Sequence, residues 1–219
     1  MNTLQNFAEN SERFNSIKVV AFDCDGVLFD SKEANVKFYS HVLEQVGHDG
    51  VRPEQREYIH MHTVRQSLLY LLGPGVQYEK AVSYCQTLDF SQFNVYMQCE
   101  PGLLEILEFV KKSYRVALAT NRTVSTRGVL THFGIDKYFD FVVSAADVAH
   151  PKPHPESMER ISHAFSATSE QILYVGDSAV DEALAGATGV IFVAYKNPKL
   201  RAHLHIGHFE ELRAVLENG

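Results

Sequence analysis

The chain has 219 residues, of which 45% are hydrophobic and 21% charged, a composition typical of a soluble globular protein. Its formal net charge of -7 argues against a broad basic surface, so neither nucleic acid nor an anionic membrane is an expected partner. The 3 cysteines are widely spaced, which suits neither a disulfide framework nor a zinc site, and residues 1–16 carry no apolar leader or anchor. These features predict a cytoplasmic protein.

The elements expected along the chain alternate between strands and helices. Residues 1–16 are a polar N-terminal extension, and residues 17–22 are a short, β-branched, almost continuously apolar run, which is typical of a buried parallel strand. Similar runs recur after residue 114, with amphipathic segments between them. Strands are predicted at 115–119, 139–144, 172–175 and 190–194, and helices at 102–113, 155–165, 179–187 and 209–216. This order predicts an α/β fold with a doubly wound, Rossmann-like parallel sheet.

Residues 32–99 interrupt this alternation, because they contain helical patterns and no convincing buried strand. Glycines and a Gly-Pro-Gly turn separate the predicted helices, which cover 32–46, 52–59, 64–72 and 78–88. We expect this inserted segment to form a helical cap, while residues 17–31 and 100–219 form the core.

Polar side chains follow three of the predicted core strands. Asp23 and Asp25 follow the first, Thr120 and Asn121 the second, and Asp177 the fourth. Because function in such folds sits at the carboxyl ends of the strands, these side chains should converge on one crevice. Two carboxylates in line suit covalent chemistry on phosphate, with Asp23 as nucleophile and Asp25 moving the proton. An Asx turn would explain one such aspartate, but it rarely needs two.

A magnesium ion is expected in this crevice, because Asp23, the backbone carbonyl of Asp25 and Asp177 offer the hard oxygen ligands that Mg²⁺ prefers. Lys152, between prolines, is predicted to offset the charge of nucleophile and phosphate, while Thr120 and Asn121 hold phosphate oxygens. Asp181, one helical turn beyond Asp177, could hold metal-bound water, orient Lys152 or act only as a helix N-terminal acid.

These motifs together resemble those of the haloacid dehalogenase superfamily of phosphohydrolases. The first motif is FDCDGVLFDS at 22–31, and ATN at 119–121, KPHP at 152–155 and GDS at 176–178 follow in the family's order. The resemblance implies the same residue roles and a branch with a small helical cap inserted after the first motif, like phosphoglycolate phosphatases and β-phosphoglucomutases. It leaves open whether Asp181 or Glu182 takes the secondary role near the metal.

The resemblance allows more than one activity. Asp25 favours phosphoryl transfer over dehalogenation, because a halide leaves without a proton. The expected function is Mg²⁺-dependent hydrolysis of a small phosphorylated metabolite by a monomer or small homo-oligomer. A sugar-phosphate mutase is the main alternative, because the cap stretch with His62 and Arg65 is similar to that branch's specificity loop and could meet a second anionic group. A non-enzymatic binding protein should show a damaged motif, and none is damaged.

Overall fold

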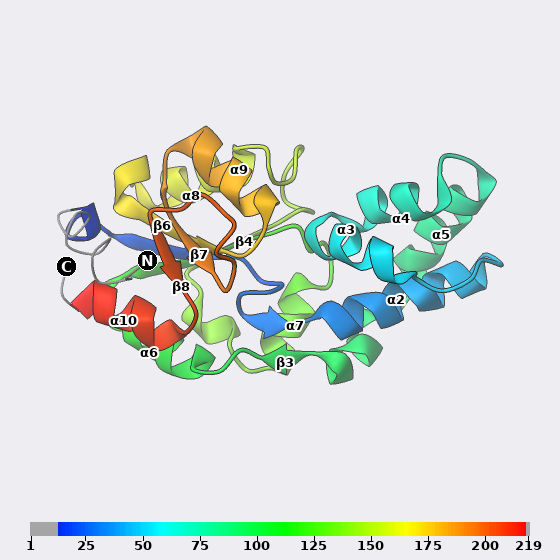
Figure 1. Cartoon of the computed structure of the whole chain (residues 1–219), viewed down its shortest axis with the longest axis horizontal. Coiled ribbons are helices and arrows are strands. Elements are labelled where there is room, and N and C mark those ends of the chain that lie inside the picture. Colours follow the sequence, from blue (N-terminus) through cyan, green and yellow to red (C-terminus); the bar gives the residue numbers. More distant parts are fainter. Residues whose placement is uncertain (1–12, 218–219) are drawn as a thin grey trace.

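The computed structural model describes residues 13–217, and a six-stranded parallel sheet forms its core (Figure 1). Every neighbouring pair of strands in this sheet is parallel. From one edge to the other, the strands are β5 (Phe141–Ser144), β4 (Arg115–Thr120), β1 (Val19–Phe22), β6 (Ile172–Gly176), β7 (Ile191–Tyr195) and β8 (Leu204–Ile206). The predicted doubly wound parallel sheet is therefore confirmed.

Helices cover both faces of this sheet (Figure 1). Successive side chains of a strand point to opposite faces, so Val20 and Phe22 of β1 join one hydrophobic cluster while Val19 and Ala21 join another. The first cluster lies against α6 (Leu103–Ser113), α7 (Thr126–His132) and α10 (Phe209–Glu217), and the second against α8 (Glu156–Phe165) and α9 (Ala179–Thr188). The centre of the sheet is thus buried on both sides, as its apolar strands require.

A helical module is inserted after β1 and lies at the opposite end of the molecule from α10 (Figure 1). An antiparallel ribbon of β2 (Phe29–Asp30) and β3 (Gln98–Cys99) brings its two ends together. Between them are α2 (Lys32–Gln45), α3 (Arg56–Met61), α4 (Val64–Leu72), α5 (Val76–Thr87) and the 3-10 helices η1 (Pro53–Gln55) and η2 (Phe90–Tyr96). Phe38, Val42 and Leu68 belong to a hydrophobic cluster of the module's own.

Several boundaries differ from the sequence predictions. The helix expected at 52–59 is a 3-10 turn, η1, followed by α3, which begins at Arg56 and extends to Met61. The short ribbon β2 and β3, the helix α7 and the edge strand β8 were not predicted, and the strand expected from residue 17 begins at Val19. Residues 1–12 of the N-terminal extension lie outside the described residues.

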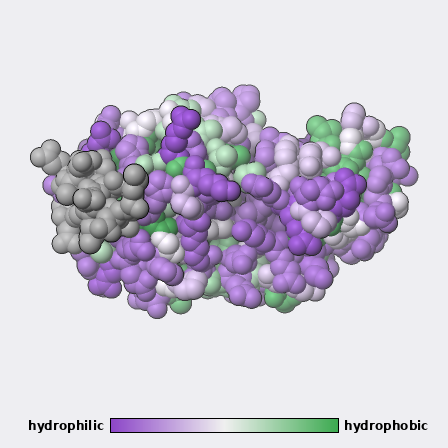
Figure 2. Space-filling model, in the orientation of Figure 1, coloured by the Kyte–Doolittle hydropathy of each residue, from purple (hydrophilic) through white to green (hydrophobic). Residues whose placement is uncertain are grey.

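The surface facing the viewer in Figure 2 is mostly hydrophilic, with green atoms gathered at the end of the helical module. Leu69 of α4 and Val76 of α5 are large apolar side chains of the module that are exposed. Among the described residues, no helix has the length and apolar character needed to cross a membrane.

Candidate active site

The loop after β1 brings two acidic segments into contact. Asp23 follows the last residue of β1, and its backbone N–H donates to the carbonyl of Val175 in β6 at 2.9 Å. Gly26 has φ +83°, and a Cβ there would lie 2.2 Å from Oδ2 of Asp177. Only glycine adopts this conformation at low cost and leaves room for the carboxylate. The loop therefore holds Asp23 and Asp177 at adjacent strand ends.

A buried lysine lies between two of the carboxylates. The Nζ atom of Lys152 is 2.7 Å from Oδ1 of Asp23 and 2.8 Å from Oδ1 of Asp181, and the lysine side chain is 3% exposed. Burial by itself lowers the pKa of Lys152, but the charges of Asp181 and Asp23 raise it above its ordinary value. Lys152 is therefore held as a cation against the predicted nucleophile.

Asp181 uses both carboxylate oxygens within the protein. Its Oδ1 accepts hydrogen bonds from Lys152 and, at 2.5 Å, from the hydroxyl of Tyr174. Its Oδ2 accepts from the hydroxyl of Ser178 at 2.6 Å and from that residue's backbone N–H at 3.1 Å. Gly176 makes this arrangement possible, because a Cβ there would lie 2.4 Å from Cβ of Asp181. With its lone pairs engaged, Asp181 is suited to orienting Lys152 rather than to binding a cation.

Asp23 and Asp177 together carry more negative charge, when ionised, than the neighbouring Lys152 neutralises. Burial is the largest cause that raises the pKa of Asp23 to about 7, against the opposing effect of Lys152. Burial and then the charge of Asp181 raise the pKa of Asp177 to about 8. Asp23 and Asp177 have carboxylate oxygens within 4.8 Å of each other. A hard divalent cation fits this crevice, because oxygen donors and surplus negative charge are what Mg²⁺ requires.

Asp25 has a different partner. Nε of Arg122 donates to Oδ2 of Asp25 at 2.9 Å and to Oδ1 at 3.1 Å, and the hydroxyl of Ser31 also donates to Oδ1. Both the arginine and the aspartate side chains are 12% exposed. Burial raises the pKa of Asp25, but the charges of Arg122 and His60 and the hydrogen bonds from Ser31 and Arg122 together outweigh it, so the net pKa lies below the ordinary value. Asp25 is thus held as a carboxylate in this arrangement.

Arg122 was not singled out from the sequence. It directly follows Thr120 and Asn121, and a basic residue so close to a predicted phosphate-binding strand end is the one available signal. Its side chain pairs with Asp25, 97 positions away in the chain, so the contact depends on the sheet order. The structure adds Arg122 to the set of candidate site residues.

Thr120 and Asn121 end β4 inside the site. Thr120 is 3% exposed, and its Oγ1 accepts a hydrogen bond from the backbone N–H of Arg122 at 3.1 Å. The side-chain amide of Asn121 donates to the carbonyl of Met61 at 3.1 Å and to that of Lys152 at 3.0 Å. Asn121 therefore connects the helical module to the segment that carries the buried lysine.

Two cavities meet around these residues. The smaller, of about 60 Å³, is lined by Asp23, Asp25, Thr120, Asn121, Arg122, Lys152, His60 and His62, together with apolar side chains of the module. A wider cleft, of about 1060 Å³, is lined by Asp177 and Ser178 on the core and by Lys32, Lys37, Arg56 and Lys199 among others. The predicted core residues are thus brought together at the carboxyl ends of the strands, next to the module.

The two predicted module residues differ in their positions. His62 lines the smaller cavity and is stacked on Tyr58, with ring centroids 3.8 Å apart and Nδ1 2.9 Å from that residue's carbonyl oxygen. Arg65 is exposed and is not among the described residues that line either cavity. His60 lines both cavities, and among the described residues its buried Nε2 has no hydrogen-bond partner. The structure therefore offers His60, rather than Arg65, to a bound molecule.

The parallel sheet, the helical insertion after its first strand and the acidic crevice with a buried lysine define an α/β enzyme of the haloacid dehalogenase type. A family model described as haloacid dehalogenase-like hydrolase matches residues 20–195, and the chain belongs to this family. The predicted family is confirmed, and with it the hydrolase class of the enzyme.

Known proteins resemble the chain in sequence and in structure. A haloacid dehalogenase-superfamily hydrolase of subfamily IA from Geobacter sulfurreducens is 37% identical, with a TM-score of 0.75 over 92% of this chain and 97% of that one. The pyrophosphatase PpaX of Bacillus cereus is 27% identical over 177 residues, which cover 75% of this chain and 76% of the relative. The β-phosphoglucomutase of Clostridium difficile shares the fold, with a TM-score of 0.76 at 19% identity over 92% of this chain and 97% of that one.

Proposed function

We propose that the protein is a Mg²⁺-dependent phosphatase that hydrolyses a small phosphorylated metabolite through an aspartyl phosphate on Asp23. The observation that carries this proposal is the 2.7 Å contact between Lys152 Nζ and Asp23 Oδ1. A buried cation in this position offsets the charge of both the carboxylate and an incoming phosphate, so the two anions can approach each other.

In the first half of the reaction, an oxygen of Asp23 attacks phosphorus and the bond between phosphorus and the leaving oxygen breaks. Asp25 donates the proton that the leaving oxygen takes, so it must enter this step protonated and give up its contact with Arg122. In the second half, Asp25 removes a proton from water as that water attacks phosphorus, and the bond from phosphorus to Asp23 breaks. The ionised Asp25 paired with Arg122 suits this second half.

The remaining residues position these groups. Thr120 and Asn121 supply a hydroxyl and a backbone N–H for phosphate oxygens, and Asp181 orients Lys152. Asp23, Asp177 and the backbone carbonyl of Asp25 would hold Mg²⁺, which when bound neutralises the crevice and keeps the phosphate in line for attack. This assignment is supported by the raised pKa values of Asp23 and Asp177.

The proposed substrate is small, because the cavity beside Asp23 and Asp25 is narrow and is lined in part by the module. The module would act as a cap that excludes bulk water while His60 and His62 face the substrate. The sequence relationship to a pyrophosphatase makes pyrophosphate the first compound to compare with phosphoglycolate and sugar phosphates.

Phosphate release from pyrophosphate, phosphoglycolate, glucose 1-phosphate and p-nitrophenyl phosphate, measured with and without Mg²⁺, tests the proposal. We expect release that requires Mg²⁺ and is lost in Asp23→Asn but kept in Asp136→Asn, a matched change at an exposed aspartate. Equal activity in Asp23→Asn would refute the nucleophile assignment. Conversion of glucose 1-phosphate to glucose 6-phosphate without net phosphate release, followed by NMR, would instead identify a mutase.

A further inference from the structure

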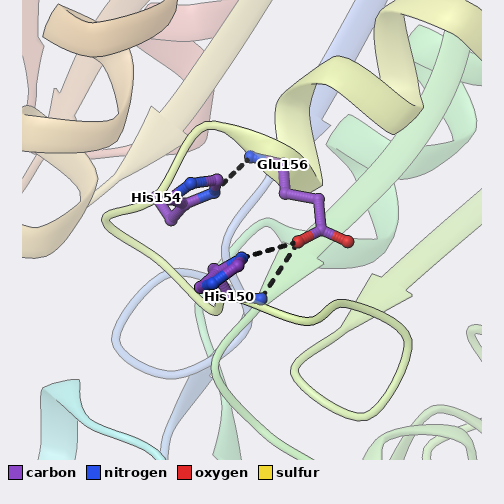
Figure 3. Close-up of side chains that lie close together, drawn as sticks. All are labelled: His150, His154 and Glu156. Carbon is purple, nitrogen blue, oxygen red and sulfur yellow. Dashed lines mark hydrogen bonds and ion pairs between the residues drawn. The ribbon is translucent and has the colours of Figure 1, made fainter.

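A second group of metal-ligating side chains lies in the segment around Lys152 but outside the site described above. His150, His154 and Glu156 come together where this segment enters α8 (Figure 3). Both histidines are exposed and Glu156 is partly buried. The proposed phosphatase reaction uses none of these side chains.

The spacing of these side chains suits one small cation. Nδ1 of His150 lies 3.5 Å from Oε2 of Glu156, and the two imidazole rings are 4.5 Å apart between centroids. Ligand atoms of all three residues lie within 4.8 Å of one another. Two ligands ~2.0–2.1 Å from a tetrahedral Zn²⁺ ion are separated by about 3.3 Å. The His150 and Glu156 atoms therefore already have the required separation, and His154 is within a small side-chain movement of it.

The glutamate carboxylate and one imidazole are held in place by the backbone. Oε2 of Glu156 accepts from the N–H of His150 at 3.0 Å, and the N–H of Ala149 is shared between both carboxylate oxygens at 3.1 Å. The N–H of Glu156 in turn donates to Nδ1 of His154 at 3.3 Å. The prolines at 151, 153 and 155 further restrict the segment. The carboxylate of Glu156 is therefore ordered before a cation binds, and His154 would coordinate through Nε2 or give up this hydrogen bond.

We propose that His150, His154 and Glu156 form a binding site for a borderline divalent cation such as Zn²⁺, separate from the all-oxygen site of Asp23 and Asp177. Two imidazoles and one carboxylate are the ligands that Zn²⁺ favours, whereas Mg²⁺ prefers oxygen alone. The histidines are open to solvent, so water can supply the fourth ligand. The ion would tie together the two flanks of Lys152, which goes beyond the proposed reaction.

Replacing Arg160 tests the proposal with a variant that should bind Zn²⁺ more tightly, whereas replacing a ligand should weaken binding. The Arg160 guanidinium lies 3.4 Å from Oε1 of Glu156 and is 49% exposed. Its positive charge competes with a cation for the carboxylate, so Arg160→Gln should strengthen Zn²⁺ binding by a few fold. His150→Ala, His154→Ala and Glu156→Gln should each weaken it at least tenfold. His132→Ala, at an exposed histidine of α7, should leave it unchanged.

Zn²⁺ binding is measured by titration calorimetry on the full chain in excess Mg²⁺, which occupies the oxygen site. Circular dichroism establishes that each variant is folded. The wild-type chain should bind one Zn²⁺ ion, and Cu²⁺ used as a probe should show nitrogen hyperfine structure in its EPR spectrum that disappears in the His150→Ala, His154→Ala double variant. No Zn²⁺ binding by the wild type, or equal affinity in all variants, would overturn the proposal.

Discussion

Asp177→Asn should make the metal-free protein more stable at neutral pH while it removes the response to Mg²⁺. Burial and the charge of Asp181 raise the pKa of Asp177 from the ordinary value of 3.8 to about 8. The folded protein therefore binds this proton more tightly than the unfolded chain. Its contribution to stability is fully present below about pH 4 and is lost as the pH rises through about 8.

The size of the effect follows from the two pKa values. Relative to pH 4, the Asp177 carboxyl costs the fold at most ~4 kcal/mol of stability near pH 7, since each pH unit between the two pKa values is worth ~1.4 kcal/mol. Partial exposure and local relaxation reduce this, so we expect asparagine to stabilise the metal-free protein by ~1–3 kcal/mol. For a chain of this length, that raises Tm by roughly 2–12 °C.

Thermal unfolding followed by circular dichroism between pH 4 and pH 8 checks this expectation. In EDTA, the Tm of Asp177→Asn should match the wild type near pH 4 and exceed it increasingly toward pH 8. Added Mg²⁺ should raise the Tm of the wild type through binding to the folded state, and raise that of the variant much less. Asp136→Asn, at an exposed aspartate, should show neither effect.

Two results would contradict the reasoning. A difference in Tm between Asp177→Asn and the wild type that does not vary with pH would mean that titration of this carboxyl is not the source of the instability. An equal Mg²⁺ response in both proteins would remove Asp177 from the proposed cation site, whatever its effect on activity.

Three other substitutions test neighbouring parts of the structure. Arg122→Met leaves Asp25 buried without its cation, so the free energy of unfolding in urea should fall by ~3–5 kcal/mol; an unchanged urea midpoint would exclude this role for the pair. Gly26→Ala places a Cβ at φ +83° against Asp177, and we expect a loss of ~1–3 kcal/mol and weaker Mg²⁺ binding by calorimetry, whereas wild-type values would refute the predicted clash. Burial raises the pKa of Asp140, but hydrogen bonds from Lys111 and from the backbone N–H of Val116 lower the pKa overall. The ionised Asp140 carboxylate therefore stabilises the fold above about pH 4, and this stabilisation is lost as the pH falls through the lower pKa of the folded state. Because Asp140 is exposed and solvent screens its carboxylate, Asp140→Asn should cost only ~0.5–1 kcal/mol near pH 7 in urea unfolding and progressively less below pH 4, and a constant difference would contradict this.

The parts of the fold that sequence predicts are those with strong apolar runs. The strands β1, β4, β6 and β7 are buried on both faces of the sheet. Their sequences are therefore almost continuously apolar, and such runs are easy to recognise. The strand β8 has three residues, with His205 at its centre, and α7 has seven residues and contains Gly128, so neither gives a clear period. Such short elements depend on the sheet and helices that they pack against.

The site was predictable where one residue type at a strand end determines the chemistry, as at Asp23 and Asp177. It was not predictable where the role depends on a contact across the fold. Arg122 belongs to no pattern, and its pairing with Asp25 follows from the adjacency of β1 and β4. Asp181 was ambiguous until its hydrogen bonds to Lys152 and Ser178 were known.

The central position of β1 also determines how the molecule should open. β1 pairs with β4 on one side and β6 on the other, and all four of its residues are buried, so its amide hydrogens can exchange with solvent only when the whole sheet unfolds. The helical module has a hydrophobic cluster of its own and can exchange through smaller, separate fluctuations. The proposed nucleophile is thus attached to a strand that exchanges only on global unfolding, whereas His60 and His62, the module residues proposed to face a substrate, belong to a unit with a hydrophobic cluster of its own.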